Sequence, residues 1–320
     1  MSAWKRQHLL GTEDLTREEI YAVLDLAADL APHALDGAKK RPDLAGRTVA
    51  NLFFEASTRT KTSFALAARR LGADVVDYTV GAGSTVKGET TVDTARNIEA
   101  MGIDAVIVRS AHAGTALLLA RSLRSAVLNA GDGAHEHPTQ ALLDLYTMRE
   151  RFGRIEGLRV AIVGDILNSR VARSNLWALK TCGAEVTFVG PPTLVPKREF
   201  EALGARVSHA LDPVLAEQDV LMLLRIQHER AATGQMPSVR EFARLYGVDA
   251  TRAAKLRPEA IVMHPGPINR GVELTPDVAD GPRSKVLRQA QNGVAVRMAC
   301  LKLVIEARRE AVAGQKRDAR

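Results

Sequence analysis

The densest group of side chains suited to chemistry lies in the segment NLFFEASTRTKTSF, residues 51–64. A hydrophobic strand is expected to end at Phe54, and a helix is expected to begin near Thr58. The carboxyl end of a parallel strand and the amino end of the following helix offer unpaired N–H groups and a positive dipole end, which favour an anion. Hydroxyl groups and a guanidinium in the same turn favour an oxyanion such as phosphate, and they belong to Ser57, Thr58, Arg59 and Thr60. The alternative is ordinary Ser or Thr capping with a solvated Arg59.

Two arginines in the second half of the sequence could each bind a carboxylate. Arg170 follows the strand-like run 159–163, and Arg225 follows the run 220–224, with Gln227 close behind. A guanidinium can bind a carboxylate through two parallel hydrogen bonds, so two arginines at strand ends suit a dicarboxylate substrate. The segment GDILNSR after the first of these strands lacks the glycines of a dinucleotide-binding turn, which argues against a nicotinamide cofactor.

Short β-branched runs alternate with longer helical patterns, and this alternation predicts the α/β class, with parallel sheets and crossover helices. A chain of 320 residues is expected to form two domains. We place the boundary where the helix from Pro138 stops at Gly153 and a new strand opens at Arg159. The expected strands are 48–54, 74–78, 105–109 and 126–129 in the first half, and 159–163, 185–189, 206–209, 220–224 and 260–263 in the second. Helical patterns in the first half start near residues 58, 89, 114 and 138.

Two terminal helices complete the expected architecture. Residues 17–30 form the first, with Thr16 at the N-cap and Glu19 three residues later as a capping box. An amphipathic pattern predicts one long helix from residue 284 to about 313.

Composition limits the remaining classes of protein. With 46% hydrophobic and 25% charged residues the chain is expected to be globular. A net charge of +7 could suit nucleic acid, an anionic membrane surface or small anions, but no aromatic-interleaved basic stretch favours nucleic acid. No apolar run approaches the ~20 residues that span a bilayer, and no signal peptide is visible, so we expect no membrane association and a cytoplasmic protein. Cys182 and Cys300 lack metal-site spacing and are expected to be buried free thiols.

The segment EASTRTKTSF closely resembles the phosphate-binding Ser-Thr-Arg-Thr segment of the aspartate and ornithine carbamoyltransferase family. Further matches follow in the family's order and spacing: VKGET from Val86, VR at 108–109, HPTQALLDL from His137, GDILNSR from Gly164, LLRIQHER from Leu223 and MHPGPINRG from Met263. The resemblance therefore extends from about residue 47 to 295.

In the first half, the resemblance implies that Thr60, Arg109 and His137 surround the oxygen of a carbamoyl group and that Gln140 binds its nitrogen. With Arg59, these groups would stabilise charge on the carbonyl oxygen and on a leaving phosphate. His137 and Gln140 are three residues apart and so share one helix face. Taken alone, Arg109 could be an exposed strand-end arginine, and His137 a helix cap or surface residue.

The Gly-rich segment VGAGSTVKGET, residues 80–90, is implied to reach into the active site of a neighbouring subunit. Lys87 would enter that site, with Ser84 as the accompanying hydroxyl. Active sites shared in this way imply a homotrimer. Taken alone, a lysine in such a loop would be solvated.

In the second half, the resemblance assigns Arg170 and Arg225 to aspartate, with Gln227 close by. It also gives Glu55 a role in pairing across the two domains.

The turn in MHPGPINRG is implied to present backbone groups to the carbamoyl NH2 and to the attacking amine. These groups belong to Pro265, Gly266 and Pro267. Proline at 267 is expected to hold Gly266 in an extended conformation. Many members of the family carry leucine at the position of Gly266, so the loop departs from the family pattern there.

The resemblance implies two doubly wound parallel-sheet domains with the active site in the cleft between them. Residues 1–145 would bind carbamoyl phosphate, with the helix at about 290–313 packing back on them, and residues 146–289 would bind aspartate. The reaction implied is carbamoyl transfer to the amine of L-aspartate, an early step of de novo pyrimidine (UMP) biosynthesis, without metal or cofactor. Such subunits often associate with regulatory or dihydroorotase-like chains.

Two alternatives remain open from the sequence. An ornithine carbamoyltransferase would be expected to carry a His-Cys-Leu-Pro segment and an acidic Asp-x-x-x-Ser-Met-Gly stretch, whereas this sequence has HPGP and no such stretch. A catalytically silent scaffold paralogue would be expected to lack some charged site residues, and none is missing here.

Overall fold

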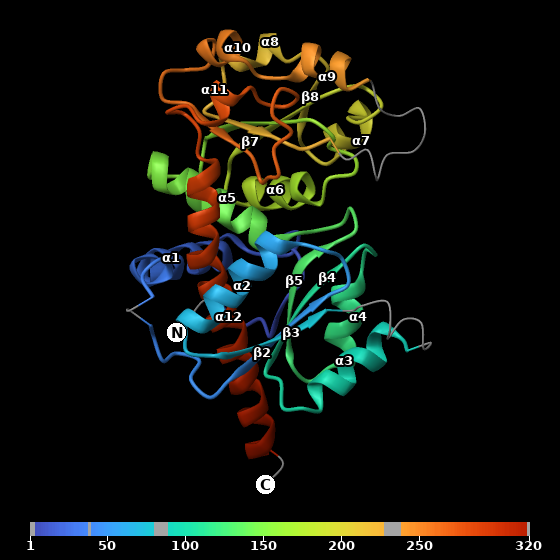
Figure 1. Cartoon of the computed structure of the whole chain (residues 1–320), viewed down its shortest axis with the longest axis vertical. Coiled ribbons are helices and arrows are strands. Elements are labelled where there is room, and N and C mark those ends of the chain that lie inside the picture. Colours follow the sequence, from blue (N-terminus) through green and yellow to red (C-terminus); the bar gives the residue numbers. More distant parts are fainter. Residues whose placement is uncertain (1–3, 38–39, 80–88, 227–237, 319–320) are drawn as a thin grey trace. The chain divides into compact units, whose positions relative to one another are not determined.

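The computed structural model of the chain describes residues 4–37, 40–79, 89–226 and 238–318 (Figure 1). Contacts divide it into two compact units, Met1–Tyr146 with Gln291–Arg320, and Thr147–Ala290. Each unit is built around its own parallel sheet with helices on both faces, which confirms the predicted fold class of two doubly wound α/β halves. Among the described residues, no helix is long and apolar enough to cross a membrane.

The described part of the first unit contains a five-stranded sheet in the order β1-β5-β4-β2-β3, with every pair parallel. Its strands are β1 (His8–Leu9), β2 (Thr48–Phe53), β3 (Asp74–Thr79), β4 (Ala105–Ser110) and β5 (Ala126–Asp132). The chain adds β3 on one side of β2 and then β4 on the other. Ligand sites in open α/β sheets form at such a switch point, outside the carboxyl ends of the strands.

Helices cover both faces of this sheet (Figure 1). They are α1 (Arg17–Ala34), α2 (Thr58–Arg70), α3 (Thr91–Glu99), α4 (Thr115–Ser122), the start of α5 (Pro138–Phe152) and most of α12 (Val286–Asp318). Ala50 and Leu52 of β2 pack with Ala95 of α3 and Leu119 of α4 in one apolar cluster. The alternate residues of β2 face the side that α2 covers. Burial on both faces explains why β2 and β4 are hydrophobic almost throughout.

The described part of the second unit contains a second five-stranded parallel sheet, in the order β10-β9-β6-β7-β8. Its strands are β6 (Arg159–Val163), β7 (Glu185–Val189), β8 (Arg206–Ser208), β9 (Val220–Leu223) and β10 (Ile261–Met263). The chain adds β7 and β8 on one side of β6 and then β9 and β10 on the other. The switch point of this sheet therefore lies between β6 and β9.

Two helical layers cover this second sheet. The helices are α6 (Arg170–Thr181), α7 (Lys197–Ala202), α8 (Asp212–Leu215), α9 (Val239–Tyr246), α10 (Ala250–Ala254) and α11 (Pro276–Ala279). Ala161 and Val163 of β6 pack in a cluster with Phe242 of α9. On the opposite face, the ring of Phe188 in β7 meets that of Phe200 in α7 edge to face, with centroids 5.0 Å apart.

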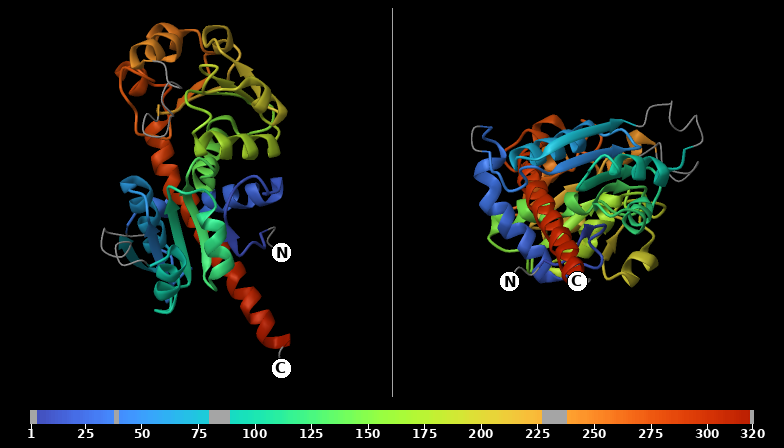
Figure 2. Two further views of the ribbon diagram at one scale, coloured as in Figure 1. Left: turned by 90° about the vertical axis from the view of Figure 1, so that its right-hand side faces the viewer. Right: turned by 90° about the horizontal axis from the view of Figure 1, so that it is seen from below.

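The two terminal helices follow the predicted pattern. The Thr16 side chain accepts a hydrogen bond from the Glu19 N–H, and the Glu19 carboxylate accepts one from the Thr16 N–H, which confirms the capping box of α1. Helix α12 is long and unbroken (Figure 2). Arg309 and Glu310, near its carboxyl end, are exposed.

The expected strands agree with the observed ones to within a few residues, except for β1. This two-residue strand was not predicted, and it exists because His8 and Leu9 pair with Val127 and Leu128 of β5. Cys182 and Cys300 are free and buried, as expected.

Candidate active site

The switch point of the first sheet brings two of the predicted segments together. Strands β2 and β4 are neighbours, with Phe53 opposite Arg109, and the Phe54 N–H donates to the Arg109 carbonyl at 2.8 Å. The turn into α2 and the end of β4 therefore lie side by side. A phosphate-binding turn and an arginine at this place can act on one anion.

Helix α2 begins at Thr58 with Ser57 as its N-cap residue. The Ser57 side chain makes no capping hydrogen bond, so simple capping does not explain it. Thr60 is buried, whereas Thr58 and Arg59 are exposed. The first turn of α2 contains no acidic residue that would neutralise the positive end of the helix dipole from within the helix.

Arg109 is held by groups of its own unit. Its Nη1 donates to the Ala130 carbonyl at 3.1 Å, and its Nε lies 3.5 Å from Glu55 Oε2. These two contacts fix the guanidinium beside the turn into α2. Glu55 thus contacts Arg109 here, and its expected role in pairing across the domains stays a prediction.

His137 and Gln140 lie at the start of α5, and both are buried. The Gln140 amide nitrogen donates to Asp144 Oδ1 at 2.9 Å, and Asp144 is fully buried. An amide whose nitrogen is engaged in this way presents its oxygen to other donors. The NH2 of a carbamoyl group is such a donor, so the orientation fits the role expected for Gln140.

Two buried carboxylates that the sequence reasoning missed hold the loop before His137. Asp132 accepts hydrogen bonds from the Gly114 N–H at 2.8 Å and the Glu136 N–H at 3.1 Å. Glu136 in turn accepts from the Thr12 N–H at 3.0 Å and from the Thr12 hydroxyl at 2.9 Å. The two acidic residues in GDGAHEHPTQ could have indicated these contacts from the sequence, because a carboxylate next to a buried strand needs hydrogen-bond donors.

Helix α12 anchors α2 close to the predicted phosphate turn. Arg297 is almost fully buried; its Nη1 donates to Ser63 Oγ at 2.8 Å, and its guanidinium lies 5.1 Å from the Phe64 ring centroid. Burial lowers the pKa of Arg297 to about 10 and raises that of the Cys300 thiol to about 12. At neutral pH the arginine stays charged and the thiol stays neutral, so the contacts of Arg297 with α2 are those of a charged guanidinium.

The switch point of the second sheet carries the two predicted aspartate-binding arginines. Arg170 is the first residue of α6, after β6, and it is buried. Ser169 caps this helix through a hydrogen bond from the Ala172 N–H at 3.1 Å, and the buried Asp165 accepts from the Asn168 N–H at 3.2 Å. Arg225 follows β9, the strand next to β6, and is half-buried. The fold therefore places both arginines at neighbouring carboxyl ends.

The HPGP turn follows β10 and differs from the expectation in one respect. Gly266 has a φ of +69°, in the left-handed region, so the predicted extended conformation is wrong. The restriction imposed by a following proline arises partly from the Cβ of the preceding residue, which glycine lacks. The Gly266–Pro267 peptide bond is cis. Pro265 and Gly266 are half-buried and Pro267 is exposed.

Three predicted site residues, Ser84, Lys87 and Gln227, lie outside the residues that the structure describes. Among the residues that it does describe, no three His, Cys, Asp or Glu side chains lie together in a way that could hold a metal ion.

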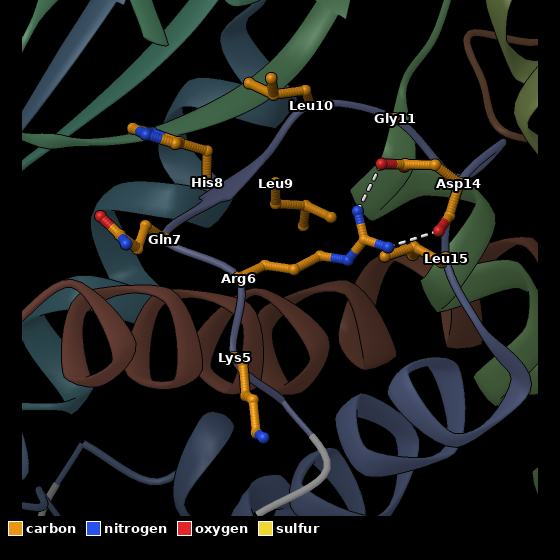
Figure 3. A pocket seen from close by; sticks show the side chains of 9 residues that line it. All are labelled: Lys5, Arg6, Gln7, His8, Leu9, Leu10, Gly11, Asp14 and Leu15. Carbon is orange, nitrogen blue, oxygen red and sulfur yellow. Dashed lines mark hydrogen bonds and ion pairs between the residues drawn. The ribbon is translucent and has the colours of Figure 1, made fainter. Parts of the chain in front are cut away.

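A pocket along residues 5–15 contains none of the predicted site residues (Figure 3). Its guanidinium, that of Arg6, is already paired with Asp14 and lies 2.7 Å from Glu19 Oε1. Desolvation, followed by the nearby charge of Arg308, lowers the pKa of His8 in the same segment. In this pocket the Arg6 guanidinium is therefore already engaged and His8 favours its neutral form, and none of the predicted site residues contributes to it.

Two family models match the chain in sequence. Residues 7–150 match the carbamoyl-P binding domain of aspartate/ornithine carbamoyltransferase, and residues 156–304 match its Asp/Orn binding domain. The chain belongs to the aspartate/ornithine carbamoyltransferase family.

Curated relatives in this carbamoyltransferase family match over nearly the whole chain. The aspartate carbamoyltransferase catalytic subunit of Opitutus terrae is 53% identical over 97% of this chain and 98% of its own. That of Frankia casuarinae is 54% identical over 93% of this chain and 94% of its own.

Solved carbamoyltransferase structures show the same fold. Aspartate transcarbamoylase from Trypanosoma cruzi in complex with carbamoyl phosphate and aspartate is 34% identical, with a TM-score of 0.86 over 95% of this chain and 98% of that chain. The same enzyme in complex with N-(phosphonacetyl)-L-aspartic acid has a TM-score of 0.84 at 34% identity, over 95% of this chain and 97% of that chain.

Proposed function

We propose that this chain transfers the carbamoyl group of carbamoyl phosphate to the amine of L-aspartate, giving N-carbamoyl-L-aspartate and phosphate in pyrimidine biosynthesis. The observation that carries the proposal is the nearly full-length match, at 53–54% identity, to enzymes named for this reaction. The described residues support it, because each sheet holds the expected charged side chains at its own switch point.

The first unit would bind carbamoyl phosphate. The open amino end of α2, with Ser57, Thr58 and Arg59, suits the phosphate group. Thr60, Arg109 and His137 would stabilise the negative charge that develops on the carbonyl oxygen, the effect that often dominates catalysis. The guanidinium of Arg109 is fixed by the Ala130 carbonyl and Glu55, so it needs little reorganisation during the reaction.

The second unit would bind aspartate. Arg170 and Arg225 would each bind one carboxylate, and the backbone of Pro265–Pro267 would contact the carbamoyl NH2 and the attacking amine. The amine nitrogen forms a bond to the carbamoyl carbon, the bond from that carbon to the phosphate oxygen breaks, and the released phosphate takes up the amine proton. No step needs a covalent bond to the protein.

The test of this function is direct. Purified protein with carbamoyl phosphate and L-aspartate is expected to release carbamoyl-aspartate and phosphate in equal amounts. With L-ornithine in place of aspartate, no carbamoylated product is expected, because two arginines would face a cationic side chain. Turnover of ornithine but not of aspartate would overturn the proposal.

The proposal includes a cytoplasmic homotrimer whose active sites are completed by Lys87 and Ser84 of a neighbouring subunit. The relatives are named catalytic subunits, which supports an assembly. Association with regulatory or dihydroorotase-like chains belongs to the same proposal.

Mixing two inactive variants tests the shared site. Arg59→Ala and Lys87→Ala, mixed after dissociation and reassembled, are expected to regain about a quarter of the wild-type activity, because that share of the sites in a cyclic trimer receives both intact side chains. Arg59→Ala mixed with Arg109→Ala is the control and should stay inactive, since one chain supplies both arginines. No recovery in the first mixture, with trimers formed, would contradict sharing.

A further inference from the structure

Glu273 is a completely buried carboxylate that lies outside the helices and strands of the second unit. It follows the HPGP turn by six residues and is not one of the residues proposed to contact either substrate. A carboxylate in such a place needs hydrogen-bond donors, because burial without them is costly.

Three N–H donors point at this carboxylate, from two different loops. Its Oε1 accepts from the Ile226 N–H at 3.1 Å and from the Asn269 side-chain amide at 2.9 Å. Its Oε2 accepts from the Asn269 N–H at 2.7 Å. Desolvation raises the pKa of Glu273, while these donors lower it. An N–H group is the donor in each of these three hydrogen bonds, so the carboxylate acts only as an acceptor.

The two loops are the ones that carry the predicted aspartate contacts. Ile226 is the residue after Arg225, at the carboxyl end of β9. Asn269 is two residues after Pro267, beyond the carboxyl end of β10. Strands β9 and β10 are parallel neighbours in the sheet, so one side chain joins the two loops that leave them.

His264 adds a contact from the base of the HPGP turn. Its Nδ1 accepts from the Gly266 N–H at 2.8 Å, so in the neutral ring the proton is on Nε2. That Nε2 lies 3.9 Å from Glu273 Oε2. The carboxylate thus faces the residues that begin the turn and those that follow it.

The main chain of Glu273 is itself fixed. Its carbonyl accepts from the Val248 N–H at 2.9 Å, and the next residue, Leu274, forms a β-bridge with Val248. The carboxylate therefore extends from a rigid point, which is what a group that positions two loops requires.

We propose that Glu273 is a positioning residue for the second substrate, holding Arg225 and the backbone of Pro265–Pro267 in the arrangement that binds aspartate. It acts through these groups and does not touch the substrate. The inference rests on the proposed function and adds a residue that supports its aspartate-binding groups.

The decisive variant is Glu273→Gln, which keeps the shape of the side chain. In either orientation the new NH2 faces a main-chain N–H, of Ile226 or of Asn269, so one donor loses its acceptor. We expect the KM for aspartate to rise about tenfold or more, the loss typical of a buried donor left unpaired. The KM for carbamoyl phosphate should rise much less, because the residues expected to bind its phosphate and carbonyl oxygen belong to the first unit and only its NH2 is implied to meet the backbone of Pro265–Pro267.

Asp219→Asn is the matched control. Asp219 also accepts a main-chain hydrogen bond, from the Arg159 N–H at 2.9 Å, and it pairs with Arg257. Because Asp219 directly precedes β9, it lies at the amino ends of the strands, away from the predicted aspartate site. This variant should lower the thermal stability without changing the KM for aspartate. Equal shifts in both variants would mean that Glu273 is merely structural and would overturn the proposal.

A milder variant keeps the proposal testable if Glu273→Gln fails to fold. Asn269→Ala removes only the side-chain donor and should raise the KM for aspartate by about threefold, with a smaller change for carbamoyl phosphate. An unchanged aspartate KM in every folded variant, with an active wild type, would overturn the role of Glu273 alone. A wild type that does not use aspartate would instead overturn the proposed function.

Discussion

Replacing Arg109 by alanine is expected to lower kcat by ~100-fold or more, the usual cost of removing one preorganised donor to a developing negative charge. The guanidinium is fixed beside the turn into α2 by Glu55 and by the Ala130 carbonyl. Its loss therefore removes a positive charge where the carbonyl oxygen and the leaving phosphate gain negative charge. Steady-state rates at saturating concentrations of both substrates measure the effect.

Two further variants test whether the effect of Arg109→Ala comes from the lost guanidinium geometry, from the lost positive charge alone, or from a loss of stability. Arg109→Lys keeps the charge but not the forked geometry, so it should recover only part of the lost rate. Arg47→Ala removes an arginine of the same unit that also pairs with a carboxylate, Asp104 at 3.1 Å. This pair lies at the amino ends of β2 and β4, whereas Arg109 lies at the carboxyl end of β4. Its kcat should stay within about twofold of the wild type. A similar loss of rate in Arg47→Ala would show that Arg109 acts through folding rather than through the substrate.

The strands and the main site segments could be predicted because their signals are local in the sequence. Strands β2 and β4 are buried on both faces and therefore read as almost continuously hydrophobic runs. Each site segment follows such a run, so the turn at 57–60 and Arg225 were found together with their strands. By contrast, β1 has two residues and no pattern of its own, and it forms only by pairing with β5.

The buried carboxylates could not be assigned because their partners are distant in the sequence. Glu136 binds Thr12, which is 124 residues away, and Glu273 binds Ile226, which is 47 residues away. No sequence pattern links either carboxylate with its distant partner, so only the folded chain reveals these two contacts. The conformation of Gly266 was missed for a different reason, since the rule for a residue before proline depends on a Cβ that glycine does not have.

Arg225→Ala is expected to raise the KM for aspartate about 100-fold, because it leaves one carboxylate of the substrate without its charge-assisted partner. The KM for carbamoyl phosphate should change far less, since the residues expected to bind its phosphate and carbonyl oxygen belong to the first unit. A rise in KM with a nearly constant kcat is the sign of lost uniform binding, which is what a residue that only holds the substrate should give. Equal effects on both KM values would contradict the assigned role.

Inhibition by succinate sharpens this test, because succinate has the two carboxylates of aspartate but no attacking amine. If Arg225 binds a carboxylate, the inhibition constant of succinate should rise with the aspartate KM in Arg225→Ala, by a similar factor. The control is Arg257→Ala, which removes an arginine that lies 2.6 Å from Asp219. Asp219 directly precedes β9, so this ion pair lies at the amino ends of the strands. Because that ion pair is remote from the carboxyl ends of the strands, both constants should stay at their wild-type values. If succinate bound Arg225→Ala as tightly as the wild type, Arg225 would have to act on the amine or on the chemistry rather than on a carboxylate.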